Sequence, residues 1–161
     1  MDVMPVSSKE VPLVGKDQVA VIRTLMLRNR AEPFVQMREI VQVHYSGWPD
    51  FGIPAEPASI VSLVSLVNDI VSSREKGEES PIIVHCSAGC GRTGTYCTVD
   101  SVIRSLNKQE VREAEDSVIY RSVLGLRMQR MSLVQTLRQY VLCHECVLHY
   151  LLGDPGDEMT N

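Results

Sequence analysis

The sequence has few aromatic residues and no excess of positive charge. Only 5% of its 161 residues are aromatic, with one Trp and two Phe, and the formal net charge is -4. No cluster of Lys and Arg occurs, so the composition gives no indication of nucleic-acid binding. The hydrophobic and charged fractions, 44% and 22%, are ordinary for a globular chain, and the length fits one domain.

Long apolar runs and a secretory leader pattern are also missing. No apolar run approaches the ~18 residues of a membrane-spanning helix, and the first residues lack a basic region followed by an apolar one. The five cysteines are an odd number, which argues against a disulfide framework. We therefore expect reduced thiols, no membrane segment, and a location in the cytoplasm or, alternatively, the nucleus.

Hydrophobic periodicity predicts strands and helices in a mixed arrangement. Residues 1–18 carry Pro and Gly without a clear pattern and are expected to form a poorly ordered arm, and residues 153–161 an acidic flexible tail. The predicted elements are strands at 19–27 and 34–45, a helix at 55–76, a short strand at 81–85, and helices at 93–106, 116–125 and 132–152. Asp116 and Ser132 are the expected N-caps of the last two helices. This order indicates an α/β fold with helices flanking a mixed sheet.

One stretch joins the short strand to the helix that follows it. It reads His85-Cys86-Ser87-Ala88-Gly89-Cys90-Gly91-Arg92-Thr93-Gly94. Small residues let successive backbone N–H groups turn inward, the helix N-terminus adds partial positive charge, and Arg92 adds a fork of donors for phosphate oxygens. Such surroundings lower a thiol pKa from about 8.5 to roughly 3.5–7.5. We therefore expect Cys86 to be a thiolate nucleophile that faces a bound phosphate.

A second irregular stretch precedes the first predicted helix. It reads Gly47-Trp48-Pro49-Asp50-Phe51-Gly52-Ile53-Pro54, and its two Pro and two Gly indicate a loop. Trp48 and Phe51 are expected to anchor this loop like a hinge and a lid. Asp50 is a candidate general acid, and the alternative is a loop Asp that caps its own turn.

Taken together, the two stretches resemble those of the classical protein tyrosine phosphatases. The first looks like the family's signature loop, and Trp48-Pro49-Asp50 looks like its mobile acid loop. The resemblance implies a phosphatase-like α/β fold with its catalytic domain at 19–152, and a metal-free, cofactor-free hydrolysis of phosphotyrosine in partner proteins. A dual-specificity phosphatase would share the Cys and Arg spacing, but the Gln-Thr-x-x-Gln-Tyr segment that starts at Gln135 argues against it.

The resemblance also implies roles for individual residues. Cys86 would attack phosphorus, and Asp50 would protonate the leaving group and later activate water. The expected catalytic residues are Cys86, Arg92, Asp50, Gln135, Thr93 and His85. The expected substrate-binding residues are Ser87, Ala88, Gly89, Cys90, Gly91, Arg92, Gln139 and Trp48.

Several of these roles have structural alternatives. Gln135 would position the hydrolytic water with Gln139 as the second glutamine of its motif, but both could equally form a polar helix face. Thr93 would direct its hydroxyl to the Cys86 sulfur, or it could be a helix N-cap. His85 would help set the loop and the Cys86 pKa, or it could be a satisfied core histidine.

Two further groups of residues have recognisable patterns. Arg127 and Arg130 fit the family's Leu-Arg-x-x-Arg segment and are expected to brace the signature loop, with carboxylates as possible intermediaries. A set of cysteines and histidines looks superficially like a metal site: Cys143, His144, Cys146 and His149. Because these residues lie inside an apolar helix rather than at a knuckle turn, we expect no metal.

The resemblance runs from about Val19 to Leu151 and matches only the C-terminal part of the family's catalytic domain. The part without a counterpart carries the loop whose aromatic residue stacks on the phosphotyrosine ring. The alternative function is therefore a truncated, catalytically impaired fragment that acts as a phosphotyrosine-binding or interaction module. Against this alternative, Cys86, Arg92 and Asp50 are all present.

Overall fold

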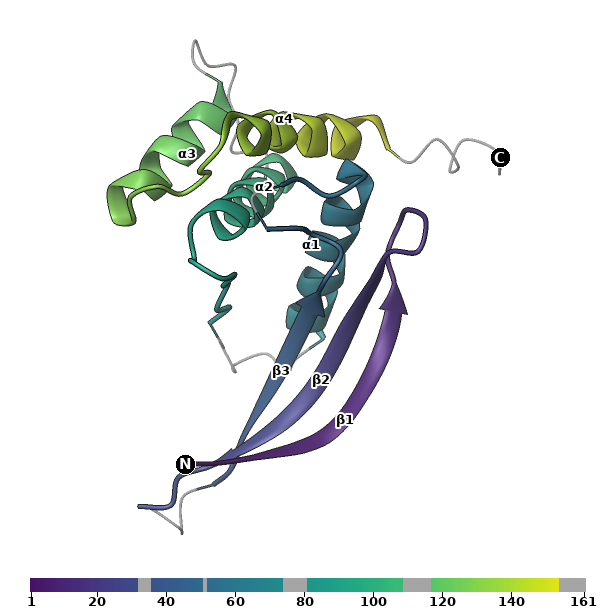
Figure 1. Cartoon of the computed structure of the whole chain (residues 1–161), viewed down its shortest axis with the longest axis vertical. Coiled ribbons are helices and arrows are strands. Elements are labelled where there is room, and N and C mark those ends of the chain that lie inside the picture. Colours follow the sequence, from purple (N-terminus) through teal and green to yellow (C-terminus); the bar gives the residue numbers. More distant parts are fainter. Residues whose placement is uncertain (32–35, 51, 74–80, 109–116, 154–161) are drawn as a thin grey trace. The chain divides into compact units, whose positions relative to one another are not determined.

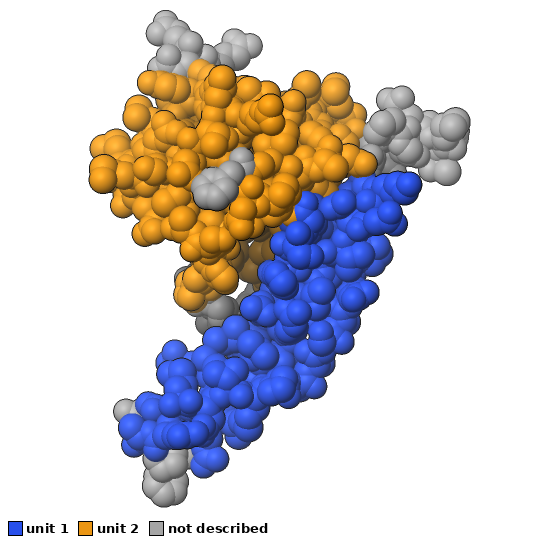
Figure 2. Space-filling model, in the orientation of Figure 1, with its two compact units in different colours: residues 1–47 blue, residues 48–161 orange. Residues whose placement is uncertain are grey.

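The computed structural model describes residues 1–31, 36–50, 52–73, 81–108 and 117–153. Their elements are β1 (Asp2–Pro12), β2 (Val19–Arg28), β3 (Arg38–Tyr45), α1 (Pro57–Ser72), α2 (Gly91–Asn107), α3 (Val118–Gln129) and α4 (Leu137–Leu152) (Figure 1). The chain divides into two compact units, residues 1–47 and residues 48–161 (Figure 2). No described helix combines the length and the apolar character that crossing a membrane requires.

The first unit is an antiparallel sheet in the order β1-β2-β3. β1 pairs with β2 along its length, with a register shift between Pro5 and Ser7. Pro has no N–H to donate, so it is tolerated at an edge strand and at such an irregularity. The strand differs from the poorly ordered arm predicted for 1–18. Nearly every residue of β1 is exposed, so its sequence carries none of the hydrophobic alternation that marks a strand.

The strands predicted at 19–27 and 34–45 are confirmed as β2 and β3. The two strands pair antiparallel from Ala20 opposite Tyr45 to Leu27 opposite Arg38. The second strand begins later than predicted, and residues 32–35 lie outside the described part of the chain. The first strand was identified by its run of Val, Ile, Leu and Met, and the second by alternation between apolar and polar residues, which matches its one more buried face.

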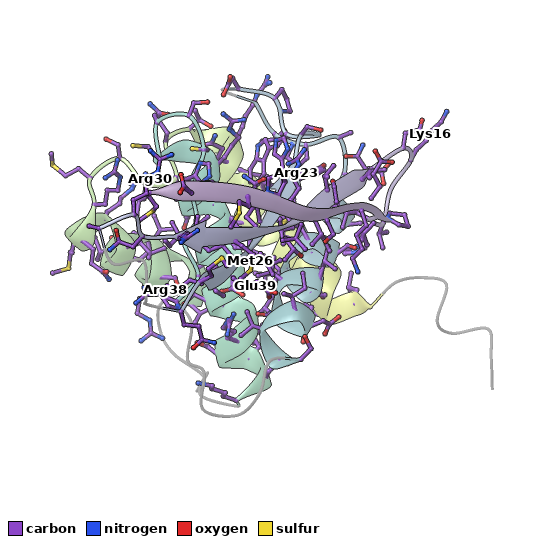
Figure 3. The ribbon with its side chains drawn as sticks, turned by 90° about the horizontal axis from the view of Figure 1, so that it is seen from below. Lys16, Arg23, Met26, Arg30, Arg38 and Glu39 are labelled. Carbon is purple, nitrogen blue, oxygen red and sulfur yellow. The ribbon has the colours of Figure 1, made fainter. Side chains whose placement is uncertain are left out.

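Polar side chains connect neighbouring strands of this sheet. Arg30 Nε donates to Asp2 Oδ1 at 2.6 Å beside the β1–β2 end, and Arg23 Nη1 on β2 donates to Gln42 Oε1 on β3 at 3.0 Å. Figure 3 labels the two arginines. Exposed pairs of this kind add little stability because water screens them. They therefore help to fix the pairing of the strands more than they stabilise the unit.

The second unit packs its helices around a common apolar core. α2 contacts α1, α3 and α4, and α1 also contacts α4. The most deeply buried core side chains are Ile60 and Val64 on α1, Val99 and Val102 on α2, and Leu142, Cys143 and Cys146 on α4. Each large apolar side chain buried in this way contributes about 1.5–3 kcal/mol. α2 is thus held by three neighbouring helices, which fixes the position of its N-terminus.

The helices occur where they were predicted, with shifted ends. α1 begins with Pro57 at its first turn, a position where the missing N–H costs nothing. α3 begins at Val118 and continues to Gln129, beyond its predicted end, while the predicted cap Asp116 lies outside the described residues. The predicted tail lies outside them too, apart from Gly153, which follows α4.

The start of α4 was predicted wrongly at Ser132. Ser132 and Val134 have φ values of 65° and 55°, so the chain is not helical there. The N-cap is Thr136, whose Oγ1 accepts a hydrogen bond from the backbone N–H of Gln139 at 3.2 Å. The helix therefore begins at Leu137, five residues later than predicted.

The predicted short strand at 81–85 is not a strand in the structure. Ile82 and Ile83 are 42% and 84% exposed, and no described strand pairs with them. A short extended segment needs a neighbour to satisfy its backbone groups before it becomes part of a sheet. The described sheet is consequently antiparallel, where a mixed sheet was expected.

Candidate active site

The signature stretch turns from an irregular segment into α2. Gly89 has a φ of 67°, a left-handed conformation that residues with side chains rarely adopt. Gly94 meets a different requirement, because a Cβ at this position would lie 2.4 Å from the backbone N of Val134. The N–H of Val134 also donates to the Cys90 carbonyl at 3.3 Å. The glycines therefore shape the loop and allow α2 to pack closely against the segment before α4.

Cys86 lies in this loop, and its surroundings favour the thiolate. Partial burial raises the pKa of Cys86, but this effect is outweighed by the Thr93 hydroxyl and by the backbone N–H groups of Thr93, Cys90 and Gly89, which favour the thiolate. The pKa of the thiol falls to about 6. Cys86 is therefore mostly ionised at neutral pH, in the form that acts as a nucleophile.

Three other cysteines have thiol pKa values that are raised and not lowered. Burial raises the pKa of Cys97, and it raises the pKa of Cys143 to about 12 and that of Cys146 further still. Cys143 donates to the carbonyl of Gln139, and Cys146 to that of Pro57. No group of three or more His, Cys, Asp or Glu in the described ranges is arranged to hold a metal ion. Cys143 and Cys146 thus belong to the helical core.

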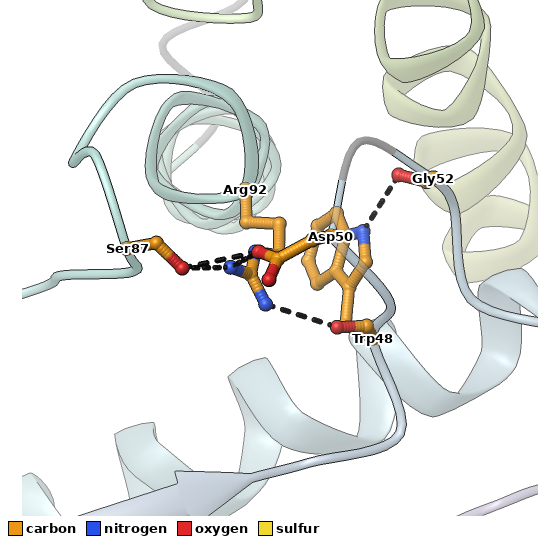
Figure 4. Close-up of polar contacts among 5 residues, drawn as sticks. All are labelled: Trp48, Asp50, Gly52, Ser87 and Arg92. Carbon is orange, nitrogen blue, oxygen red and sulfur yellow. Dashed lines mark hydrogen bonds and ion pairs between the residues drawn. The ribbon is translucent and has the colours of Figure 1, made fainter.

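Arg92 connects the signature stretch to the acid loop (Figure 4). Its Nη1 donates to the backbone carbonyl of Trp48 at 3.0 Å, and its Nη2 donates to Ser87 Oγ at 2.7 Å and pairs with the Asp50 carboxylate. Ser87 Oγ in turn donates to Asp50 Oδ1 at 3.0 Å. Asp50, Ser87 and Arg92 therefore meet directly beside Cys86.

The acid loop is closed on itself by Trp48. The indole is only 6% exposed, and its Nε1 donates to the carbonyl of Gly52 at 3.1 Å. The N–H of Gly52 donates to the Pro49 carbonyl at 3.3 Å. The expected anchoring of the loop by Trp48 is observed, whereas Phe51 lies outside the described residues. Trp48 accepts a hydrogen bond from Arg92 through its backbone carbonyl.

Thr93 and His85 differ in how closely they approach Cys86. The Thr93 hydroxyl is buried and helps to lower the pKa of the Cys86 thiol. Its expected role of stabilising the leaving thiolate stays a prediction. Its alternative as an N-cap is excluded because Cys90 occupies the cap of α2. His85 is exposed, and its side chain makes no hydrogen bond within the described residues. Its expected role in setting the loop stays a prediction without a supporting contact.

The two glutamines occupy different environments. Gln139 is 2% exposed, and its Oε1 accepts hydrogen bonds from the backbone N–H groups of Gln135 and Thr136 at 3.0 and 3.2 Å. A Cβ on Gly91 would lie 2.7 Å from Gln139 Nε2, so this side chain lies against the start of α2. Gln135 precedes α4 and is exposed, which excludes a shared polar helix face. Gln139 holds the turn that presents Gln135.

The two arginines near the end of α3 bind backbone carbonyls rather than carboxylates. Arg130 donates to the carbonyls of Gly89 and Ala88 at 3.0 and 3.2 Å, and so braces the signature loop as expected. Arg127 donates to the carbonyls of Leu133 and Val134 at 2.7 and 2.6 Å, and so braces the segment before α4. Each arginine has a separate target.

One structural residue of the site was missed in the sequence. Thr136 caps α4 and, together with Gln139, forms a capping box. The Thr-x-x-Gln spacing that marks this motif can be found in the sequence. Choosing it would have placed the helix start correctly and set Gln135 apart from the helix.

Comparison with known proteins agrees with this geometry. The family model described as protein-tyrosine phosphatase matches residues 6–149. The chain belongs to the protein-tyrosine phosphatase family. It is 35% identical over 130 residues to the human receptor-type tyrosine-protein phosphatase alpha and 44% identical over 112 residues to tyrosine-protein phosphatase 69D of Drosophila melanogaster, which cover 81% and 69% of this chain.

Solved structures of protein tyrosine phosphatases also resemble this chain. A crystal structure of the Trypanosoma brucei protein tyrosine phosphatase TbPTP1 superposes with a TM-score of 0.69 and 34% identity over 85% of this chain. The chain spans 44% of that protein and 15% and 7% of the two relatives in length. The expected α/β phosphatase fold is therefore confirmed as a partial one.

Proposed function

We propose that this phosphatase-family protein hydrolyses phosphotyrosine in proteins through a phosphocysteine intermediate. The observation that carries the proposal is that Asp50 and Arg92, 42 residues apart in the chain, meet at Ser87, the residue after Cys86. A nucleophile, a cationic fork and a carboxylic acid are the three groups that transfer of a phosphoryl group from an aryl oxygen requires.

In the first step the Cys86 thiolate attacks phosphorus in line and the bond to the tyrosyl oxygen breaks. The loop N–H groups and the Arg92 guanidinium bind the equatorial oxygens, and fixed donors of this type are usually the largest catalytic contribution. Asp50 delivers a proton to the departing oxygen, which contributes about 10²–10⁴ in rate. The products of this step are tyrosine and phosphorylated Cys86.

In the second step water cleaves the sulfur–phosphorus bond. Asp50, now a carboxylate, takes a proton from the water, and the exposed amide of Gln135 orients the attacking oxygen. The Thr93 hydroxyl, which faces the sulfur, stabilises Cys86 as it leaves as a thiolate. Inorganic phosphate then departs and the starting state returns.

Substrate binding has to displace Asp50 from the anion site. In the structure its carboxylate engages Arg92 and Ser87, two donors that a phosphoryl group also needs. The Asp50 side chain is 62% exposed and the acid loop is held mainly by Trp48, so the carboxylate can swing away while the loop stays in place. Asp50 thereby leaves the donors that bind the phosphoryl oxygens and becomes free to donate a proton to the leaving group.

We infer the substrate class from the family, and the cellular location from the free cysteine thiols. Phosphotyrosine-containing proteins are the partners that we propose, and the five free cysteines fit a reducing compartment such as the cytoplasm. We propose residues 19–152 as the catalytic portion, and the family match over residues 6–149 adds most of β1 to it. The alternative of a non-catalytic module is not favoured, since Cys86, Arg92 and Asp50 are retained together.

The test is turnover of a small aryl phosphate and of a phosphotyrosine peptide by the purified chain. Cys86→Ser should abolish turnover, while Cys97→Ser, a matched loss of a half-buried thiol on α2, should leave it within about twofold because Cys97 lies outside the site. A thermal melt of each variant establishes that it is folded. Absence of turnover by a chain that melts cooperatively would overturn the proposal.

A further inference from the structure

Arg130 contacts two backbone carbonyls of the signature loop. It is the C-cap residue of α3, and its Nε and Nη2 donate to the carbonyls of Gly89 and Ala88 at 3.0 and 3.2 Å. A Cβ built on Gly89 would lie 3.3 Å from Arg130 Nη2, so the guanidinium packs directly on this glycine. The contact is bidentate, from one planar group to two adjacent carbonyls.

The two carbonyls belong to particular peptide units. A peptide unit carries its C=O and its N–H at opposite ends, so the Ala88 carbonyl is paired with the Gly89 N–H and the Gly89 carbonyl with the Cys90 N–H. The N–H groups of Gly89 and Cys90 are two of the backbone groups that lower the pKa of Cys86. Arg130 therefore holds the carbonyl ends of two peptide dipoles whose N–H ends favour the thiolate.

We propose that Arg130 is a positioning residue for Cys86, which it serves by fixing and polarising the Ala88–Gly89 and Gly89–Cys90 peptide units toward the thiolate. A cation at the carbonyl end makes each N–H a stronger donor, because hydrogen bonds in a chain polarise one another. The bidentate fork also keeps both N–H groups aimed at one point. The catalytic value of this arrangement rests on the proposed phosphatase function, but its effect on the thiol does not.

Other arginines of α3 provide internal comparisons. Arg127 is also bidentate, but its carbonyl partners Leu133 and Val134 belong to peptide units whose N–H groups are not among those at the sulfur. Arg121 is exposed, and its side chain makes no hydrogen bond within the described residues. Removing Arg121 thus changes only the charge of the helix, whereas removing Arg130 removes the two carbonyl contacts as well.

The experiment measures the ionisation of Cys86 directly. Iodoacetamide alkylation is followed against pH, and the extent at Cys86 is read by tandem mass spectrometry, which separates it from Cys90 in the same peptide. Arg130→Gln should raise the Cys86 pKa by roughly 0.5–1 unit, an estimate from the weakening of two charge-assisted hydrogen bonds. Arg121→Gln should leave it unchanged within ~0.2 unit.

The Arg130→Lys variant separates the effect of the bidentate guanidinium geometry from the effect of the positive charge. An ammonium keeps the positive charge but cannot hold two carbonyls in fixed directions, so this variant should lie between the wild type and Arg130→Gln. A folded Arg130→Gln chain with an unchanged Cys86 pKa would overturn the proposal, as would an equal rise in Arg121→Gln. If Arg130→Gln does not melt cooperatively, an unchanged pKa in folded Arg130→Lys overturns it instead.

Failure of this proposal is distinct from failure of the proposed function. Alkylation requires no phosphatase turnover, so a wild type that hydrolyses no aryl phosphate can still show the shift in Arg130→Gln. Conversely, a wild type that turns over aryl phosphate while Arg130→Gln has a normal Cys86 pKa contradicts only the role of Arg130. If both hold, the acidic limb of kcat/KM in Arg130→Gln moves to higher pH by the same amount.

Discussion

The carboxylate of Asp50 pairs with the guanidinium of Arg92, and the hydroxyl of Ser87 bridges the two. The same guanidinium also holds the carbonyl of Trp48. One arginine therefore binds both the acid and the backbone of the loop that carries the acid. A carboxylate in this position occupies donors that would otherwise bind phosphoryl oxygens.

Replacing Asp50 by Asn should separate its two effects. Loss of the proton donor should lower kcat for an aryl phosphate by about 10²–10⁴. Loss of the competing charge should tighten binding of inorganic phosphate by about 1.4- to fivefold, since an exposed ion pair is worth about 0.2–1 kcal/mol. Competitive inhibition constants for phosphate and kcat for the aryl phosphate measure the two effects.

Asp17→Asn is the control for this experiment, because Asp17 has a φ of 57° that Asn tolerates and lies in the first unit. It should alter neither quantity. Weaker phosphate binding by Asp50→Asn would contradict the competition between Asp50 and phosphate.

Replacing Arg92 by Lys should be far from conservative. Lys keeps the charge but cannot reach the Trp48 carbonyl and Ser87 Oγ in two fixed directions, as the two Nη atoms do. Loss of one preorganised donor costs about 10²–10³ in rate, and we expect kcat/KM to fall by at least that factor. The measurement is steady-state kinetics with a small aryl phosphate, and activity within about threefold of wild type would refute the role of the fork.

The pKa of Cys86 predicts a defined pH dependence of stability. The folded value of about 6 lies below the ordinary value of 9.0, so the thiolate stabilises the folded state. This contribution is fully present above about pH 9, declines as the pH falls, and is absent below about pH 6. Cys86→Ser removes it.

Thermal melts across this range should therefore show wild type and Cys86→Ser diverging as the pH rises, with the wild type relatively more stable at the alkaline end. A difference in melting temperature that is independent of pH would contradict the lowered pKa. In kinetics the same ionisation should appear as a fall in kcat/KM of about tenfold per pH unit below about pH 6.

Replacing Gly89 by Ala and replacing Gly125 by Ala should change the stability of the fold in opposite directions. Gly89 has a φ of 67° and Arg130 Nη2 within 3.3 Å of an added Cβ, so Gly89→Ala should cost about 1–2 kcal/mol. Gly125 lies within α3 with nothing within 4 Å of an added Cβ, so Gly125→Ala should stabilise by about 0.5–1 kcal/mol. Urea unfolding midpoints measure both, and equal effects would refute the assignment of a left-handed turn at Gly89.

The elements that could be predicted from the sequence are those with a regular hydrophobic period. The β2–β3 hairpin and all the described helices have one face more buried than the other, and that asymmetry is visible as a repeat. β1 has almost no buried residue and therefore no repeat. The opposite error occurred at 81–85, where four apolar residues in a row predicted a buried strand but Ile83 is 84% exposed.

The sequence was enough to predict which residues form the site, but only some of the contacts between them. Residue types and spacing identified Cys86, Arg92 and Asp50 as candidates, because nucleophile, fork and acid need particular side chains. The contact of Asp50 with Ser87 spans 37 residues and depends on how the acid loop folds around Trp48, which no local pattern specifies. The left-handed residues Ser132 and Val134 likewise delay α4 for reasons of packing against α2.

The most direct test of the central claim is detection of phosphate on Cys86 during turnover. The purified chain is mixed with an aryl phosphate, quenched with acid after a few milliseconds to seconds, and digested for tandem mass spectrometry. We predict a phosphorylated Cys86 in the wild type, more of it in Gln135→Ala because water attack is slower, and none in Cys86→Ser. Turnover by folded Cys86→Ser, or phosphate on another residue in its place, would contradict the assignment of Cys86 as the nucleophile.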